Sequence, residues 1–407
     1  MKTLIKIAWR NLWRNRRRTI LTASAVILAL FLALIMRSMQ FGSYEQMIKA
    51  GVNQVGDLQV HDTGYWANQS IDRAFFYREN ISKALNGIKE IKRVLPGLET
   101  FSLASYGKQT KGVLISGIDP VLQNRQNHLS GKIIRGKYLT GKKDDVLLGD
   151  KLAEFLKMKV GDTLVLLGQG YRGITAYGIY KVAGIFHLPS IQLNNQVVYM
   201  NLKAAQNFAY PYHPGLLTSL SVFIKDPGDL QMVKKEIEHR LGPDFEVISW
   251  KTMLSDILQT IKVDNVSGQI MLLILYIIAA FGIFSTILMM TMEKRKQYAI
   301  MVSIGMERRR LVWVSILETF IISIIGIAIG LMLASPVIYY LHFHPIPITG
   351  DMAKMYLEFN IEPILPFSIK AHVFLSQVII VLALSLLSAL YPIIYLSRFN
   401  ILNAFRH

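Results

Sequence analysis

Four long apolar segments dominate the hydrophobic pattern of the chain, and apart from Arg37 at the end of the first span the only charged residue within them is Glu318. About 20 apolar residues are needed to cross a bilayer as a helix, so each segment is long enough for one crossing. Charged residues make up only 18% of the chain, which is below the roughly 25% of soluble domains. We therefore expect four transmembrane helices. The expected spans cover residues 19–37, 270–292, 311–335 and 373–396.

The pattern between the first two spans is that of a folded domain. Residues 56–62 alternate like a strand, residues 100–119 predict a hairpin, and residues 219–250 predict a strand–helix–strand unit. Residues 79–97 predict an amphipathic helix that stops at Pro96-Gly97. We expect a large extracytoplasmic α+β domain over residues 38–269 with two lobes. One lobe combines residues 40–119 and 216–265, and a mostly β lobe over residues 120–215 is inserted into it.

The charge distribution predicts the topology of the spans. The formal net charge is +18, and residues 1–18, 293–310 and 397–407 together hold 15 basic and 2 acidic residues. A soluble chain this basic would suggest a nucleic-acid partner, but here the charge lies beside apolar segments, so we expect none. Short basic loops stay in the cytoplasm. Both termini and residues 293–310 are therefore expected there, with residues 38–269 and the short loop 336–372 on the other side.

Residues 1–18 show helical periodicity. Ile5, Ala8, Trp9, Leu12 and Trp13 recur at helical spacing, with basic residues between them. A basic amphipathic helix with tryptophans is suited to the membrane interface. The alternative is that the basic residues serve only as a topology signal; the periodicity favours the interfacial helix.

Motifs that suggest catalysis fail on inspection. GQGYRG at residues 168–173 lies between two strand-like segments, so a hairpin turn explains it better than a dinucleotide site. GKIIRGKY at residues 131–138 has phosphate-loop spacing but ends in Tyr138, where Ser or Thr is needed. His342 and His344 have no obvious further metal ligands. We expect no enzyme activity, no catalytic residue, no metal and no bound cofactor in this chain.

The basic loop between the second and third spans contains apolar residues. Tyr298, Ile300, Met301 and Ile304 lie where the topology expects water, and an isolated loop has no reason to expose them. A short helix with a turn at Gly305 that docks into a groove of a cytoplasmic partner would explain them.

Two features distinguish the third span. Gly326 and Gly330 form a G-x-x-x-G pattern, which lets two helices approach closely, although apolar spans also contain such pairs by chance. Glu318 is an intramembrane charge, and such charges often have a function. It lies only ~10 Å inside the span at 1.5 Å per residue. We therefore favour a structural role, with a cytoplasmic Arg or a backbone donor as its partner.

Taken in order, these segments resemble the FtsX-like permeases, the membrane subunits of ABC transporters that include the LolC/LolE lipoprotein-releasing type and MacB. The resemblance rests on AWRNLWRNRRRTILT (8–22), the domain after the first span, EKRKQYAIMVSIGMERRR (293–310) and YPIIYLSRFNILNAFRH (391–407). Glu293, Gly305 and Glu318 stand at the matching positions. In the domain, GIDP (117–120), VLLGDKLAEFLKMKVGDTLVLL (146–167) and YKVAGIF (180–186) are also similar.

The resemblance implies partners and a location. Two permeases, identical or different, would pair in the bacterial inner membrane with porter-like and sabre-like lobes in the periplasm. Separate ATPase subunits would bind ATP and Mg and would contact the loop at residues 293–310. The residues implied at this contact are Glu293, Arg295, Tyr298, Ile300, Met301, Ile304, Gly305 and Met306.

The resemblance also implies candidate functions. The order of the segments and the length of the chain are closer to LolC/LolE. This favours extraction of lipoproteins from the membrane and their delivery to a periplasmic carrier. That function would need an apolar cavity between the first and second spans, open to the outer leaflet and in contact with membrane lipids, where methionines suit variable acyl chains. The candidate cavity residues are Leu32, Met36, Met39, Phe41, Ile270, Met271 and Ile274. The alternatives are MacB-like extrusion of peptides or antibiotics from the periplasm, and FtsX-like signalling to a periplasmic hydrolase.

Overall fold

The computed structural model describes residues 2–14, 16–140, 144–188, 191–351, 353 and 363–397. The chain divides into two compact units. A helical unit contains residues 1–46, 259–347 and 364–407, and an inserted domain contains Met47–Leu258 with residues 348–363. The expected loop 336–372 and tail 397–407 lie partly or largely outside the described residues.

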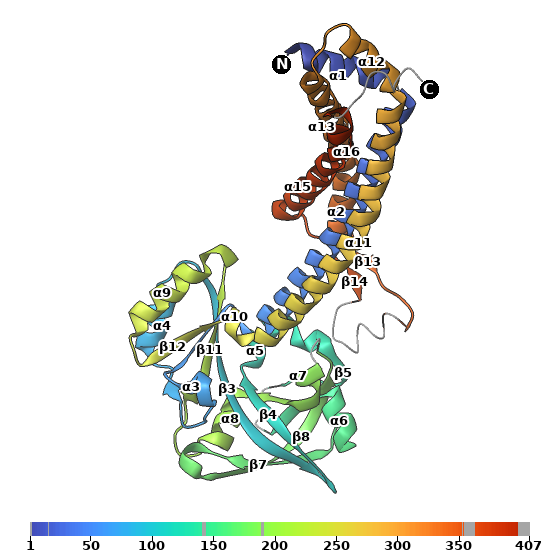
Figure 1. Cartoon of the computed structure of the whole chain (residues 1–407). Helices are drawn as coiled ribbons and strands as arrows, with labels where there is room; N and C mark the ends of the chain where they lie inside the picture. Colours follow the sequence, from blue (N-terminus) through green and yellow to red (C-terminus); the bar gives the residue numbers. More distant parts are fainter. Residues whose placement is uncertain are drawn as a thin grey trace. The chain divides into compact units, whose positions relative to one another are not determined.

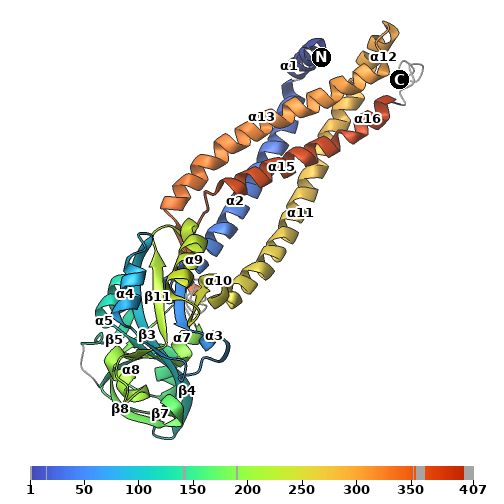
Figure 2. The same ribbon diagram turned by 90° about the vertical axis from the view of Figure 1, so that its left-hand side faces the viewer.

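The expected fold class is confirmed. Within the described part of the chain, four helices are long and apolar enough to cross a membrane, and a large α/β domain lies between the first and second of them (Figure 1). The four are α2 (Arg16–Val55), α11 (Ser255–Glu293), α13 (Arg308–Phe343) and the pair α15 (Ala371–Ser388) and α16 (Leu390–Ser397). In the helical unit these helices run alongside one another (Figure 2).

The helices extend beyond the expected spans. α2 continues to Val55 rather than ending at residue 37, and α11 begins at Ser255 rather than at residue 270. α13 passes through Pro336 and ends at Phe343 rather than at residue 335. Apolar length predicts only the part of a helix that lies in lipid, because backbone hydrogen bonds continue equally well between polar residues. Membrane helices also tolerate proline.

The helical unit has an apolar core contributed by all four helices. α2 and α11 provide most of it, and Ile327, Ala334 and Ile338 of α13 and Val381 of α15 complete it. Tyr276 of α11 donates a buried hydrogen bond to the Gln377 side chain of α15, so the core also contains a polar link.

The inserted domain is built on one ten-stranded sheet. Its strand order is β12-β1-β11-β3-β4-β9-β6-β8-β5, and β7 pairs with β3 and β8. The strands are β1 (Leu58–Asp62), β3 (Ile91–Tyr106), β4 (Gln109–Ile118), β5 (Ile133–Gly136), β6 (Asp145–Gly149), β7 (Thr163–Gln169), β8 (Thr175–Phe186), β9 (Val197–Asn201), β11 (Ser219–Ile224) and β12 (Phe245–Ser249). The pairs β4–β9 and β6–β8 are parallel, and the other pairs are antiparallel.

Three apolar clusters pack against this sheet. One combines residues from the two ends of the insertion, with α4 (Glu79–Asn86) and α9 (Leu230–Leu241) as its helices. The other two are formed mainly by residues between Leu98 and Leu216. The long strands β3 and β4 run through both regions, so a single sheet connects the two predicted lobes.

Several elements in the domain match the sequence patterns. β1, the β3–β4 hairpin and the unit β11–α9–β12 lie where they were expected. GQGYRG forms the turn between antiparallel β7 and β8, as predicted.

Two expectations about the domain were wrong. The helix predicted over residues 79–97 ends at Asn86, and Pro96-Gly97 lies within β3. Pairing with β11 on one side and β4 on the other overrides the helical pattern, and because the β4 pairing begins only at Gly97, Pro96 has one paired neighbour. Residues 120–215 are also less purely β than expected. They include the helices α5 (Pro120–Asn127), α6 (Asp150–Leu156), α7 (Ile191–Gln196) and α8 (Leu202–Ala209).

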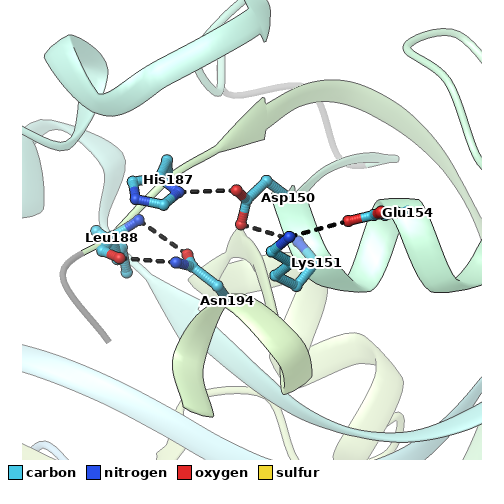
Figure 3. A network of polar contacts seen from close by, with 6 residues as sticks. All are labelled: Asp150, Lys151, Glu154, His187, Leu188 and Asn194. Carbon is cyan, nitrogen blue, oxygen red and sulfur yellow. Dashed lines mark hydrogen bonds and ion pairs between the residues drawn. The ribbon is translucent and has the colours of Figure 1, made fainter. Parts of the chain in front are cut away.

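A polar network holds the start of α6 against α7 (Figure 3). The Asp150 carboxylate lies 2.8 Å from Nδ1 of His187, and the Asn194 side chain exchanges two hydrogen bonds with the backbone of Leu188, of 2.8 and 2.7 Å. A Cβ at Gly149 would lie 2.3 Å from the carbonyl oxygen of Asn194, so only glycine allows this approach. We interpret the network as structural.

Glu99 of β3 is a partly buried carboxyl group whose pKa is raised by burial. It lies near Tyr65 and Tyr199, and its charge contributes to raising the pKa of both phenols. The folded domain therefore binds the Glu99 proton more tightly than the unfolded chain does. This contributes stability below the unfolded pKa of roughly 4.3, and the contribution is lost as the pH rises through the folded pKa.

We predict that Glu99→Gln raises the thermal unfolding temperature near neutral pH and has a much smaller effect at acid pH. Circular dichroism melts of the full chain in detergent over a pH series would measure this. Glu79→Gln, at an exposed carboxylate of α4, is the matched control and should show no such trend. A stabilisation by Glu99→Gln that is the same at every pH would contradict the assignment.

Candidate functional site

The segment between α11 and α13 is a short helix followed by a tight turn. α12 covers Arg295–Ser303, and Gly305 has φ +101°, a left-handed conformation that favours glycine. The amides of Gly305 and Met306 bond back to the carbonyls of Val302 and Met301, and α13 begins at Arg308. The predicted helix and turn are thus present in the structure.

The apolar residues of this segment divide between two sides. Ile300 is 50% exposed and Ile304 is 82% exposed. Tyr298 points the other way and is buried with Ala299, Leu311 of α13 and Leu396 of α16. Met301 and Met306 are partly buried beside this cluster. Tyr298, expected at a partner contact, is therefore part of the interior, and its side chain is only 1% exposed.

A buried ion pair lies under α12. Nζ of Lys294, the residue between α11 and α12, is 2.6 Å from Oε2 of Glu318 on α13, and both side chains are 1% exposed. Asn11 of α1 (Lys2–Arg14) donates from Nδ2 to the other carboxylate oxygen at 2.8 Å. Glu318 thus joins three elements. Its partners are Lys294 and Asn11, not the arginine or backbone donor expected.

Glu318 also affects Tyr298. Burial raises the pKa of the Tyr298 hydroxyl group well above its usual range, and the Glu318 carboxylate raises it further. Both effects favour the neutral form of the phenol beside the ion pair.

Two further contacts connect the start of the chain to the α12 segment. Arg18 of α2 pairs with Glu293, the last residue of α11, and Arg14 of α1 donates to the Gln297 side chain on α12. Glu293, expected at a partner contact, thus makes an ion pair within this chain. Arg295 is also partly buried.

Gly326 and Gly330 lie against α2. A Cβ at Gly326 would be 2.8 Å from Cβ of Val26 and 3.2 Å from the carbonyl oxygen of Ala23. A Cβ at Gly330 would be 3.1 Å from Cδ2 of Leu30. The close approach therefore joins the first and third apolar helices.

The candidate cavity residues do not form one uniform surface. Leu32, Ile270, Met271 and Ile274 are exposed, whereas Met36, Met39 and Phe41 are partly buried. The Phe41 ring contacts Tyr44 and His372, and the guanidinium of Arg37 lies 4.7 Å from its centre.

A polar network near these residues was missed by the sequence interpretation. Arg37 donates to Gln40 at 2.6 Å, and Gln40 and Tyr44 both donate to Asp264 of α11, at 3.2 and 2.6 Å. Gly268 leaves room for Gln40, because a Cβ there would overlap its amide. The spacing of Arg37, Gln40 and Tyr44 on one helical side was the available signal.

No group of three or more His, Cys, Asp or Glu in the described ranges could hold a metal ion. His342 instead bonds to the carbonyl of Phe367. At α12 the structure thus combines exposed isoleucine side chains with a buried charge network.

Comparison with known protein families assigns the chain to a family. A family model described as "MacB-like periplasmic core domain" matches residues 19–240, which is more than half of the chain. The chain belongs to this family. A model described as "FtsX-like permease C-terminal" matches residues 269–401, the part that contains α12 and Glu318. The expected relationship to the FtsX-like permeases of ABC transporters is thus confirmed.

Curated relatives are similar at low identity. The lipoprotein-releasing transmembrane protein LolE of Haemophilus influenzae is 23% identical over 326 residues, covering 77% of each chain. LolC of Buchnera aphidicola is 23% identical over 265 residues, so the alignment spans 63% of this chain and only 63% of that protein. The uncharacterized permease YknZ of Bacillus subtilis is 21% identical over 353 residues, 80% of this chain and 84% of YknZ.

Solved structures also show a likeness to part of this FtsX-like permease. The periplasmic region of MacB from Actinobacillus actinomycetemcomitans matches at 15% identity and TM-score 0.34, over 52% of this chain and 98% of that one. The extracellular domain of YknZ matches at 16% identity and TM-score 0.34, over 47% and 99%. The family assignment rests on the two family models.

We predict that removing one member of the Lys294–Glu318 pair destabilises the chain more than replacing both members. Glu318→Ala leaves Lys294 charged and unpaired in the interior, which should lower the free energy of unfolding by about 3–5 kcal/mol. Replacing both residues, as Lys294→Met with Glu318→Leu, should recover most of this loss, because well-packed apolar residues often substitute for a buried pair. Reversible unfolding of the detergent-solubilised chain in increasing SDS would measure both.

The exposed pair Lys151–Glu154 of α6 is the control. Glu154→Ala should cost about 1 kcal/mol or less. Equal losses for Glu318→Ala and Glu154→Ala would show that the Lys294–Glu318 pair is not desolvated.

A second prediction concerns the α2–α13 contact. Gly326→Ala should destabilise the chain by about 1–3 kcal/mol through overpacking against Val26. Gly282→Ala of α11 is the matched control, since a Cβ at Gly282 would have no atom of the described residues within 4 Å, and it should be neutral or stabilising by about 0.5–1 kcal/mol. The same unfolding assay applies. If adding Val26→Ala does not restore Gly326→Ala, the clash is not the cause.

Proposed function

We propose that this chain is the permease subunit of an ABC transporter whose separate ATPase subunits bind α12, and that its cargo is lipoprotein drawn from the outer leaflet of the bacterial inner membrane. The observation that carries the proposal is the mounting of α12. Its exposed residues Ile300 and Ile304 project from a helix whose base is fixed by the Lys294–Glu318 pair.

The ATPase contact follows from the chemistry of α12. A short helix with exposed isoleucines and flanking basic residues suits a groove with apolar walls and an acidic rim. Arg308, Arg309 and Arg310 are exposed beside it. ATP and Mg would be held entirely by the ATPase, and the permease contributes position and force.

Movement of α12 would pass into the helices through a series of contacts. Lys294 precedes α12 directly and is bonded to Glu318, so a displacement of α12 acts on α13. α13 in turn packs closely on α2 at Gly326 and Gly330. α2 and α11 each continue into the inserted domain, so a tilt of either helix reaches the domain without crossing a loop.

The lipoprotein cargo is supported by the LolC and LolE relatives and by exposed apolar residues near the middle of α2 and of α11. Leu32, Ile270, Met271 and Ile274 are exposed within the helical unit and would contact acyl chains or a second permease. Delivery would require a periplasmic carrier. Extrusion of peptides or antibiotics is the second candidate, because the alignment with YknZ covers more of both chains and the name of YknZ does not specify lipoproteins.

We predict that Ile304→Glu abolishes co-purification of the ATPase with the permease while leaving membrane insertion unchanged. The physical reason is the burial of a carboxylate in an apolar contact. Ile179→Glu of β8, at another exposed isoleucine of the chain, is the control and should leave co-purification intact. Normal recovery of the ATPase with Ile304→Glu would rule out the docking role.

The cargo is tested separately by depleting the permease in its native host and measuring lipidated proteins in the inner and outer membranes. Lipoproteins should accumulate in the inner membrane, and wild-type but not Ile304→Glu permease should restore their distribution. The distribution could stay unchanged on depletion although the wild-type permease co-purifies with its ATPase. That result would exclude lipoprotein release and direct the search to export of peptides or antibiotics.

A further inference from the structure

α1 has one buried side and one exposed side. Ala8, Asn11 and Leu12 are buried, and α1 packs against α13. The predicted apolar side of the helix is therefore split, because Ile5, Trp9 and Trp13 remain exposed. Of the expected helix over residues 1–18, the structure describes α1 over Lys2–Arg14 and places residues 16–18 at the start of α2.

The exposed side combines aromatic rings with cations. The Trp9 and Trp13 rings lie edge to face with their centres 6.0 Å apart, and the guanidinium of Arg16 lies 5.7 Å from the Trp13 ring. Lys6 and Arg10 are exposed beside them. Residues 1–18 contain seven basic residues and no acidic one.

Charge and composition identify what covers this side. Tryptophan prefers the headgroup level of a bilayer, and clustered Lys and Arg are attracted to anionic lipids. A soluble protein partner would have to present a dense acidic surface to the same residues. The adjacent helix α2 begins its uncharged stretch at Thr19, which places α1 next to the end of an apolar helix.

α1 is bonded to the α12 segment directly and through its neighbours. Asn11 reaches Lys294 through Glu318, and Arg14 donates to Gln297. Arg18, just after α1, pairs with Glu293. The three contacts meet the chain at Glu293, Lys294 and Gln297, which are the end of α11, the junction and α12, so they restrict how α12 can pivot.

We propose that α1 binds anionic phospholipid headgroups through its exposed tryptophans and basic residues, and that this seating fixes the orientation of α12 through Asn11, Arg14 and Arg18. Asn11 is a positioning residue, because it acts on α12 through Glu318. The inference deepens the proposed function, since it concerns how α12 is held for the ATPase. It is tested without the ATPase, so either idea can fail alone.

The test uses the absence of cysteine in the sequence, which lets introduced cysteines carry spin labels without background. Labels at Ile304→Cys and Met332→Cys report the position of α12 relative to α13, since both sites are exposed. The pair Trp313→Cys and Met332→Cys, both on α13, is the control. Distance distributions are measured by pulsed electron resonance on the full chain in nanodiscs of phosphatidylcholine, with or without phosphatidylglycerol.

We expect phosphatidylglycerol to narrow the 304–332 distribution and to leave the 313–332 distribution unchanged. Lys6→Gln with Arg10→Gln should remove the narrowing, whereas Lys157→Gln with Lys159→Gln, at exposed cations of the domain, should not. A distribution equally narrow in phosphatidylcholine alone would overturn the role of anionic lipid.

A second variant separates lipid seating from its transmission to α12. Asn11→Ala should keep the quenching of Trp9 and Trp13 fluorescence by brominated phosphatidylglycerol, measured against Trp9→Phe with Trp13→Phe, yet lose the narrowing at 304–332. Narrowing that persists in Asn11→Ala would overturn the positioning role of Asn11. Loss of quenching in Asn11→Ala would show that the contact serves only to hold α1 in place.

Discussion

The desolvated pair of Lys294 and Glu318 is the interaction on which the basic end of the helical unit depends. Two charges with 1% exposure are stable in the interior only when each is compensated. Glu318 achieves this with Lys294 on one oxygen and Asn11 on the other. The three side chains come from α13, the α11–α12 junction and α1, so the requirement to pair a buried charge fixes the relative positions of these segments.

This constraint explains why α12 can present apolar residues without collapsing onto the bundle. Tyr298 is held inside by the apolar residues packed around it, while Gly305 reverses the chain with a positive φ. Ile304 is consequently left exposed. A loop without these anchors would bury its isoleucines. In the proposed function, this exposed helix is the contact for the ATPase subunits of an ABC transporter.

Close helix packing extends the constraint along the bundle. Gly326 and Gly330 allow α13 to approach the backbone of α2, so a shift of α13 cannot be absorbed by side-chain rearrangement alone. Buried polar contacts such as Tyr276–Gln377 also resist displacement of the helices, because no water is present to replace a lost hydrogen-bond partner. The helical unit is thus suited to transmitting small displacements.

The sequence by itself determined the four apolar helices, the inserted α/β domain, the hairpins and the helix–turn segment at Gly305, because each depends on periodicity or turn chemistry within a short window. Tertiary structure decided what depends on distant partners. Strand pairing turned residues 91–97 from helix into β3. Burial moved Tyr298 inward, and Asn11 and Glu318 met although 307 positions separate them. Local patterns contain no information about such pairs, since their energy arises only when the folded chain excludes water from both.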